Sequence, residues 1–512
     1  MRKILVTISG GIFFAVILVI TLRYVENKLM SEYGVNPIPE FTAEPTAEPE
    51  VQIVEGAYDG ENPLSEDELQ QINDLTISNV ENFEFLKSMT HLINLRVDEE
   101  SASTVMGDIA DLSELVNLEI IDLGTAQISG DIGDISGLSK LTYIDMSGYI
   151  PTVDSLDTEE TISQVMDIER VKGDISELKN LVDLTYIDFN NTDVQGDIAS
   201  LSEMTGLKHL DLNMTKSYGN IKVFESLKNM EYISLGNLSS GMTFGFEDEP
   251  EKAAIEGDFS VFGQLSNLTY LSLVYSDVEG DLAAISDLAT LETVALDGCN
   301  VSGKLSAFEK MENLKYVSIV NDEGDAIEGD VSSFAGMNAL EHISLNGRGI
   351  TGDISVFTDK TKMNYISFVE CEISGDLSSL SSLVNLECLA LTKEKDQDST
   401  ILTGELLDIA GMKNMSTLLL SYSDIKGRLG DIKPLEKLSI ITIAGCPIEG
   451  NIGALVGMKN LTMLALMDID IKGDISVLSD IPNLLMVYAE NTNMTGKLTN
   501  SLGMEIINLE SE

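Results

Sequence analysis

Residues 257–280 read GDFSVFGQLSNLTYLSLVYSDVEG, and this unit recurs along most of the 512-residue chain. Its opening glycine is found sixteen times, and eleven of the fifteen intervals between successive copies are 23 residues. The other four intervals contain insertions of 3 to 20 residues. A fixed period of this length predicts a solenoid of stacked repeats. The recurring glycines are Gly107, Gly130, Gly173, Gly196, Gly219, Gly257, Gly280, Gly303, Gly329, Gly352, Gly375, Gly404, Gly427, Gly450, Gly473 and Gly496.

Each repeat contains two hydrophobic patterns. Every third residue from Phe259 to Leu268 is apolar, which is typical of a 3₁₀ turn or short helix with one buried face. Leu271 and Leu273 then alternate with other residues, which indicates a strand with one face inward. Neither half can bury its apolar side chains alone, so neighbouring repeats must stack.

The L-x-x-L-x-L pattern within these repeats resembles that of the leucine-rich repeat family. The segments Asn267–Leu273 and Asn460–Leu466 are similar to bacterial internalin-type surface proteins, and the ending Ile128–Ile132, ISGDI, is similar to the plant receptor-like variant. The resemblance covers roughly residues 63–512. It implies an α/β leucine-rich repeat solenoid, a horseshoe with a parallel β-sheet on its concave face and short helical or 3₁₀ segments on its convex face.

Two further columns of residues follow the repeat. Nineteen positions after the glycine stands a residue such as Thr192, Cys299, Cys371 or Cys446. In the family that this chain resembles, this slot holds an inward side chain that bonds the backbone of the turn. These cysteines are 72 and 75 residues apart, several rungs of the solenoid, which exceeds the reach of a disulfide.

An aspartate follows most of the repeat glycines, as at Asp131, Asp174 and Asp197. Aspartate at the start of a helical turn predicts an N-cap. A calcium-binding ladder is the alternative, and Lys304 and Arg428 in the same slot count against it. We expect no metal and no cofactor.

The N-terminal residues differ from the repeats. Residues 1–30 contain an apolar run at 4–22, long enough to cross a bilayer, which predicts a signal anchor or transmembrane segment, with a cleaved signal peptide as the alternative. The Pro/Glu-rich residues 31–62 predict a linker. The repeat domain is expected at 63–512, with an N-terminal cap at about 63–80 that opens on the capping box Ser65-x-x-Glu68. The protein is then membrane-anchored and extracellular-facing, or secreted if residues 1–30 are cleaved.

The chain is strongly acidic, with 85 acidic and 31 basic residues and a formal net charge of −54. Such a surface repels nucleic acid and favours basic partners. The sequence contains no phosphate-binding glycine loop, no paired-cysteine zinc spacing and no H-E-x-x-H motif, and we therefore expect no enzyme.

The candidate ligand-binding residues flank the inward pair of each predicted strand and are expected to be exposed on the concave face. Aromatic side chains suit recognition, although they can also simply stack on neighbouring strands. Alanine at Tyr186, Tyr232 and Tyr270 is expected to abolish binding without lowering thermal stability, if recognition is their role. The candidates are Tyr143, Tyr186, His209, Tyr232, Tyr270, Tyr316, His342, Tyr365, Asp122, Asp145, Asp188 and Asp211.

We therefore expect a cell-surface protein that binds a protein or glycan through its concave face, and the acidic surface favours a basic ligand. The resemblance to internalin-type proteins implies adhesion. Two alternatives remain: a carbohydrate-active enzyme on a parallel β-helix, and a passive envelope spacer.

Overall fold

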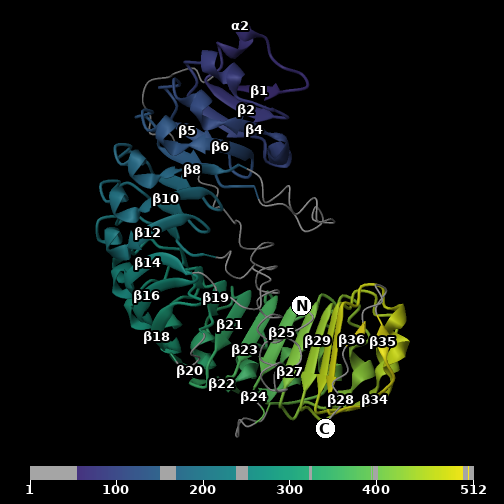
Figure 1. The fold of residues 1–512 in the computed structure, drawn as a ribbon. Helices are drawn as coiled ribbons and strands as arrows, with labels where there is room; N and C mark the ends of the chain where they lie inside the picture. The colour runs from purple at the N-terminus through teal and green to yellow at the C-terminus, as the bar shows by residue number, and fades with distance from the viewer. Residues whose placement is uncertain are drawn as a thin grey trace. The chain divides into compact units, whose positions relative to one another are not determined.

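The computed structural model describes residues 55–149, 169–237, 252–321, 326–393, 395, 402–499 and 505–506. These residues form two compact units, an N-terminal unit that ends at Thr290 and a C-terminal unit that begins at Leu291. Each unit is a solenoid in which most rungs carry a main strand, a second strand and a 3₁₀ turn (Figure 1). The predicted signal anchor, most of the linker and parts of the insertions lie outside the described residues.

In the N-terminal unit the main strands form a parallel sheet, and the second strands run parallel to one another beside it. The main strands are β1 (Glu55–Asp59), β2 (Asp74–Ser78), β3 (Asn94–Val97), β5 (Ile120–Asp122), β7 (Tyr143–Asp145), β9 (Tyr186–Asp188), β11 (His209–Asp211), β13 (Tyr232–Ser234) and β15 (Tyr270–Ser272). The second strands are β4 (Met106–Asp108), β6 (Gln127–Asp131), β8 (Val171–Asp174), β10 (Asp193–Asp197), β12 (Lys216–Asn220), β14 (Ala253–Asp258) and β16 (Ser276–Asp281). The helical segments are α2 (Glu66–Leu69), η1 (Glu84–Ser88), η2 (Glu99–Thr104), η3 (Ile109–Leu112), η4 (Ile132–Ile135), η6 (Ile175–Leu178), η7 (Ile198–Leu201), η8 (Ile221–Glu225), η10 (Phe259–Gln264) and η11 (Leu282–Ile285).

The C-terminal unit repeats this plan. Its main strands are β17 (Thr293–Ala295), β19 (Tyr316–Ile319), β21 (His342–Asn346), β23 (Tyr365–Val369), β25 (Cys388–Thr392), β27 (Thr417–Ser421), β29 (Ile440–Ala444), β31 (Met463–Met467) and β33 (Met486–Glu490). The second strands are β18 (Asn300–Lys304), β20 (Ile327–Asp330), β22 (Ile350–Asp353), β24 (Glu372–Asp376), β26 (Leu402–Thr403), β28 (Gly427–Arg428), β30 (Ile448–Asn451), β32 (Asp470–Asp474) and β34 (Asn493–Thr495). The 3₁₀ turns are η12 (Leu305–Phe308), η13 (Val331–Phe334), η14 (Ile354–Phe357), η15 (Leu377–Leu380), η16 (Leu406–Ile409), η17 (Leu429–Ile432), η18 (Ile452–Leu455) and η19 (Ile475–Asp480). β35 (Leu498–Thr499) and β36 (Glu505–Ile506) pair antiparallel, unlike the parallel rungs.

The core consists of the apolar side chains that the spacing pattern predicts. In the rung that follows Gly196, the apolar residues Ile198, Leu201, Met204, Leu207, Leu210 and Leu212 are all at most 2% exposed. The first four come from the spacing-three run and the last two from the alternating run. Both halves of the predicted repeat are thereby confirmed.

The second strand is the main departure from the predicted rung, which contained one strand. In β10 only Val194 and Gly196 are buried, and polar residues surround them. A strand with so short an apolar pattern cannot be told from a turn by periodicity alone.

The repeat glycine lies near the end of the second strand, where the backbone has a positive φ that residues with a Cβ avoid. Gly196 has φ +115°, and a Cβ there would lie 2.4 Å from Asp174 Oδ1 of the preceding rung. Asp174 is the N-cap of η6, where its Oδ1 accepts a hydrogen bond from Ser176 N at 2.9 Å. The predicted aspartate caps are therefore confirmed, and a glycine such as Gly196 leaves room for the cap of the neighbouring rung.

A further column of left-handed residues lies eighteen positions after the glycines, in the turn that follows each main strand. Gly298 (φ +69°) and Asn191 (φ +56°) suit it, because glycine and asparagine tolerate positive φ. Met214 occupies the same position at φ +58°, where a β-carbon costs about 1–2 kcal/mol.

We expect Met214→Gly to raise the free energy of unfolding by about 1 kcal/mol, since relief of the left-handed strain exceeds the added entropy of the unfolded chain. Chemical denaturation measures this change. Asn191→Gly is the matched control and should change stability by less. An equal or smaller gain at Met214 than at Asn191 would contradict the strain argument.

The cysteines lie where the repeat predicts them. Thr192 Oγ1 donates to Phe189 O at 2.6 Å, and Cys371 Sγ and Cys446 Sγ lie 3.4 Å from Val369 O and Ala444 O. All four cysteines are buried and free of disulfides. The inward slot of the turn is thus confirmed for threonine and cysteine alike.

The capping box predicted at Ser65 and Glu68 forms, and a strand precedes it. Glu68 accepts hydrogen bonds from Ser65 N at 2.9 Å and from Ser65 Oγ at 2.6 Å, which completes the capping box of α2. These bonds lower the pKa of Glu68. However, β1 lies inside the predicted linker and pairs in parallel with β2, so the sheet reaches back to Glu55.

Within the described ranges, no helix is long and apolar enough to cross a membrane. The apolar run at 4–22 lies outside those ranges.

Candidate functional site

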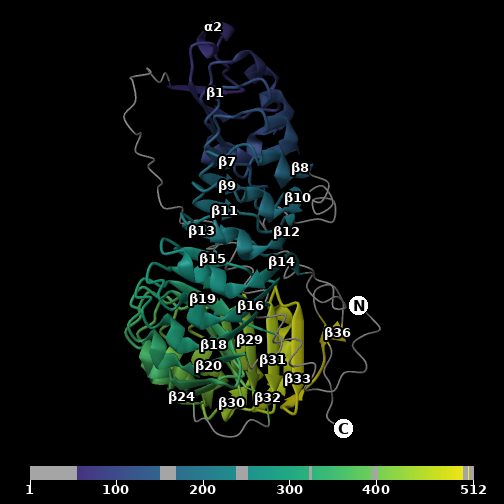
Figure 2. The same cartoon turned by 90° about the vertical axis from the view of Figure 1, so that its left-hand side faces the viewer.

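The candidate residues lie on the face of each main sheet that is turned away from the core, hereafter the strand face. In β9, Ile187 points inward and is fully buried, while Tyr186 and Asp188 flank it in sequence. Because successive side chains of a strand alternate between faces, Tyr186 and Asp188 share the strand face. Strands β7, β9, β11 and β13 follow one another in the sheet (Figure 2). Their pairing keeps this register, so the same holds for each of these rungs.

Five aromatic side chains form one continuous stack on the strand face of the N-terminal unit, hereafter the ring column. Successive ring centroids lie 3.9–4.1 Å apart and the ring planes are within 14° of parallel. Parallel strands in register place equivalent side chains about one strand spacing apart, which produces this stack. Its members are Tyr143, Tyr186, His209, Tyr232 and Tyr270.

The ring column is less open than predicted. Tyr186 is only 7% exposed, because neighbouring rings cover both of its faces, and the other four members are half-buried. Burial raises the pKa of Tyr186 and Tyr270 and lowers the pKa of His209 to about 3. His209 is therefore neutral at physiological pH.

This stacking changes the expected effect of alanine. Each stacked contact is worth about 0.5–1.5 kcal/mol, so Tyr186→Ala should lower the free energy of unfolding by about 2 kcal/mol. Tyr186→Phe keeps both contacts and should be nearly neutral. Thermal unfolding of the two variants measures the difference, and equal stability of the alanine and phenylalanine variants would contradict a structural role for the stack.

Four carboxylates form a second column beside the rings, hereafter the carboxylate column. The sheet register pairs Asp122 with Asp145, Asp145 with Asp188, and Asp188 with Asp211. Each aspartate lies two residues after the residue of the same strand that occupies the register position of the ring column. The two columns therefore run side by side across the strands. The sheet therefore brings the predicted Tyr and Asp residues of this unit together.

Local hydrogen bonds hold the carboxylates. Asp188 Oδ1 accepts from Asn190 N at 2.8 Å, and Asp211 Oδ1 accepts from Asn213 N at 2.9 Å. Tyr232 links the two columns, since its hydroxyl donates to Asp211 Oδ2 at 3.0 Å.

The carboxylate column is electrostatically costly. Burial raises the pKa of Asp145, and burial together with Asp145 and Asp211 raises that of Asp188 well above its usual range. Burial raises the pKa of Asp211 to about 6 against the hydrogen bonds from Asn213 and Tyr232. Like charges on adjacent strands disfavour each other's ionised form. A cationic group from outside would relieve this repulsion.

The structure adds two residues to the carboxylate column that the sequence pattern did not indicate. Arg96 pairs in register with Asp122 and forms a 2.6 Å ion pair with Asp74. Asn190 Nδ2 lies 3.4 Å from Asp211 Oδ1 and reaches across from the neighbouring rung. The cap rungs are too irregular to align with the repeat glycines, which hid Arg96.

The C-terminal unit holds a shorter stack of Tyr316, His342 and Tyr365, with centroids 4.1 Å apart. Tyr365 is fully buried and His342 is 4% exposed, so the prediction that this column is exposed is wrong for both. Burial lowers the pKa of His342 to about 3. The sheet continues with Cys388, Thr417 and Ile440 at the same register position.

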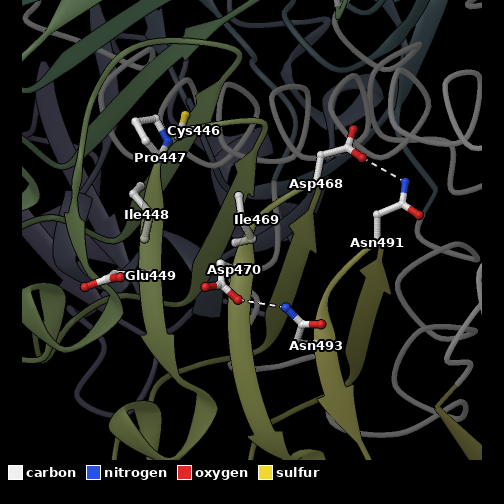
Figure 3. A pocket seen from close by; sticks show the side chains of 9 residues that line it. All are labelled: Cys446, Pro447, Ile448, Glu449, Asp468, Ile469, Asp470, Asn491 and Asn493. Carbon is white, nitrogen blue, oxygen red and sulfur yellow. Dashed lines mark hydrogen bonds between the residues drawn. The ribbon is translucent and has the colours of Figure 1, made fainter.

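An open hollow of about 530 Å³ lies elsewhere in the C-terminal unit, beside the turns that follow the main strands (Figure 3). Its carboxylates already have partners. Asp468 accepts from Lys395 Nζ and Asn491 Nδ2, both at 2.8 Å, and Asp470 accepts from Asn493 Nδ2 at 2.7 Å. None of the predicted site residues lines it. Across the described ranges, no cluster of His, Cys, Asp and Glu is arranged to hold a metal.

Solved structures provide the comparison that decides the fold. The leucine-rich repeat ectodomain of the Arabidopsis receptor kinase HAESA, in complex with an IDA peptide hormone ligand, is 20% identical, with a TM-score of 0.57 over 89% of this chain and 76% of that one. The fold is a leucine-rich repeat solenoid. The rungs of strands and 3₁₀ turns also rule out the alternative of a parallel β-helix.

Two other leucine-rich repeat structures are similar. The ectodomain of the Arabidopsis thaliana receptor kinase GASSHO1/SCHENGEN3, in complex with CASPARIAN STRIP INTEGRITY FACTOR 2, is 18% identical, with a TM-score of 0.54 over 85% of this chain and 54% of that one. An internalin from Listeria monocytogenes is 20% identical, with a TM-score of 0.43 over 58% of this chain and 78% of that one. No family model matches the chain, and no curated protein matches it. The internalin-like subtype stays a prediction.

Proposed function

We propose that this chain is a non-catalytic binding protein that holds a protein or peptide on the strand face of its N-terminal unit. The observation that carries the proposal is the carboxylate column beside the ring column, four acidic side chains on successive strands whose mutual repulsion a basic ligand would relieve. The partner group with the matching chemistry is an arginine or lysine side chain. Arginine fits best, because its planar guanidinium can bond carboxylates bidentately and lie against tyrosine.

The stacking favours a protein over a glycan. Sugars bind proteins by laying a ring on an open aromatic face, but the faces of Tyr186, His209 and Tyr232 are covered by their neighbours. The edges and hydroxyl groups that remain suit hydrogen bonds to a peptide. The peptide and protein ligands bound by the two plant ectodomains support the same class of partner.

We further propose that the protein faces the cell exterior, anchored by residues 4–22 or released after cleavage. The apolar run and the acidic composition support this placement, as do the ectodomain neighbours. A passive spacer would need neither column.

A random peptide library panned against the immobilised protein tests the proposal. We expect selected peptides to be enriched in arginine and lysine, and this enrichment to disappear when Asp188→Asn and Asp211→Asn are combined. Panning at pH 5 should also reduce it, since Asp211 becomes protonated below about pH 6. Equal enrichment with and without the two aspartates would refute the proposed site and favour a spacer.

A further inference from the structure

The four members of the carboxylate column are not equally accessible. Asp145 and Asp211 are buried, at 8% and 4% exposed, whereas Asp122 and Asp188 are half-buried. The sheet register orders the column Asp122, Asp145, Asp188 and Asp211. Accessibility therefore alternates from strand to strand, and the two more accessible carboxylates are two strands apart.

Local contacts explain why the other two carboxylates are buried. Asp145 Oδ1 accepts from Ser147 N at 3.0 Å and from Ser147 Oγ at 2.8 Å. The Asp145 carboxylate also lies against Gly124 of the preceding rung, where a Cβ would be 2.7 Å from Oδ1. Asp211 is held through its Oδ2 by the Tyr232 hydroxyl at 3.0 Å. These two carboxylates are therefore already engaged by the protein.

Asp188 keeps one carboxylate oxygen for a ligand. Its Oδ1 accepts from Asn190 N at 2.8 Å, and its Oδ2 accepts no hydrogen bond from the described residues. A cationic group bound to Oδ2 would also lie about one strand spacing, 4.8 Å, from the carboxylate on either side. Asp188 is therefore the strongest single position for a basic side chain.

Asp122 is the second accessible carboxylate, and the column ends beside it. The next position, on β3, is Arg96, which forms a 2.6 Å ion pair with Asp74 of β2, on the side of β3 away from β5. The positive charge of Arg96 would repel a further basic group. At the other end, the position after Asp211 is Ser234, which is 3% exposed and uncharged. The column therefore suits two basic side chains and not a longer basic run.

The distance between the two accessible carboxylates selects a ligand backbone. Adjacent strands lie about 4.8 Å apart and the stacked rings 3.9–4.1 Å apart, so Asp122 and Asp188 are separated by about 8–10 Å. Side chains on one side of an extended peptide are about 6.6 Å apart at two residues and about 13 Å apart at four. In a polyproline II helix every third residue faces the same way, about 9.3 Å further along, which matches.

We propose that the ligand is a peptide in the polyproline II conformation that runs across the strands and carries two basic side chains three residues apart. One basic side chain pairs with Asp188 and the other with Asp122. This inference rests on the proposed function and narrows its class of partner. An α-helix with basic residues seven apart, about 10.5 Å, is the alternative in length. Its backbone bonds itself, whereas a polyproline II backbone leaves its carbonyl groups free for the polar side chains of the strand face.

A series of fluorescent peptides tests the spacing with the full-length protein. Each peptide has two arginines in the same proline-rich host, two, three, four or six residues apart. We expect a spacing of three to bind at least about 10-fold more tightly than two or four, which turn the second arginine to another side of the polyproline II helix. A spacing of six keeps the side but separates the arginines by about 19 Å, longer than the column, so it should also bind weakly. An alanine-rich helical peptide with arginines seven apart completes the series.

Two substitutions assign the ends of the ligand. Asp122→Asn and Asp188→Asn should each weaken binding of the spacing-three peptide about 10-fold. Asp131→Asn is the matched control, because it removes one charge from the N-cap of η4, where asparagine already serves at the equivalent Asn220, and it should change binding by less than about 2-fold.

The outcomes separate this inference from the proposed function. If all spacings bound equally and Asp188→Asn weakened each of them, the spacing inference would be overturned while the proposed site stood. Tightest binding by the helical peptide would overturn it as well. If Asp122→Asn and Asp188→Asn left every peptide bound as tightly as the wild type does, both the inference and the proposed site would be wrong.

Discussion

Replacing Gly196 with alanine should lower the free energy of unfolding by about 3 kcal/mol. Two costs add up: the φ of +115° is a backbone conformation that residues with a β-carbon avoid, and the new Cβ would meet Asp174 Oδ1 at 2.4 Å and Ile175 N at 3.1 Å. The Asp174 side chain can move only by giving up its cap of η6. The loss is therefore shared by two rungs.

Gly206→Ala is the matched control, because it lies in the same repeat and its new Cβ would have no neighbour closer than 4.0 Å. It should leave stability nearly unchanged. Urea unfolding of both variants measures the difference. If Gly196→Ala were as stable as Gly206→Ala, the glycine column would not be the structural element that fixes the period.

The carboxylate column should make stability fall as pH rises from about 4 to about 6. The pKa of Asp211 is about 6 in the folded protein, against a usual value of 3.8, so the folded state holds its proton more tightly than the unfolded state between these pH values. Unfolding then releases protons, and raising the pH favours it. The difference of about two pKa units corresponds to about 3 kcal/mol, fully expressed above pH 6. Asp211→Asn removes this ionisation.

We therefore expect Asp211→Asn to gain stability relative to the wild type as pH rises from 4 to 7. Asp174→Asn is the control of opposite sign. Hydrogen bonds from Ser176 lower the pKa of Asp174, so its contribution stabilises the fold at neutral pH and is lost as pH falls below about 4. Denaturation of the three proteins at several pH values measures both trends. A wild-type advantage over Asp211→Asn that grows with pH would contradict the burial of this column.

Much of the fold could be predicted because the same hydrophobic pattern, which is weak in any single rung, recurs in every repeat. One rung such as Ile198–Leu212 would be ambiguous, but sixteen glycines in phase fix the strand, the 3₁₀ turn and the cap. The second strand could not be predicted, since β10 buries too few side chains to show a period. The left-handed column at Met214 was also hidden, because residues of many types occupy it.

The positions of the site residues on the strand could be predicted, but the burial of their side chains could not. The alternation of side chains assigned Tyr186 and Asp188 to one face of the strand. In the structure Tyr186 stacks on Tyr143, and Asp188 lies in register with Asp145 on the neighbouring strand. Sequence pattern contains no information on what covers a face. It therefore missed the burial of His342 and Tyr365, which share the register of exposed positions elsewhere.

The two units thus offer different chemistry on equivalent surfaces. In the N-terminal unit the strand face is aromatic and acidic, and we assign it to a basic peptide. In the C-terminal unit it is apolar. One repeat supports both because its core positions are constant while its strand-face positions vary, which is how repeat proteins change partners without changing fold.

The most direct test of the central claim is to measure how tightly an arginine-bearing peptide, selected by panning, binds two variants of this protein. The variants lose the same number of aspartates but at different places. Asp188→Asn/Asp211→Asn alters the carboxylate column. Asp197→Asn/Asp281→Asn removes the same charge from two N-caps, where asparagine already serves at Asn220 and Asn451. We predict that the first variant weakens binding about 100-fold, because a buried charge pair loses one partner, and that the second leaves it within about 2-fold. Equal weakening in both variants would show that net charge, and not this face, binds the peptide.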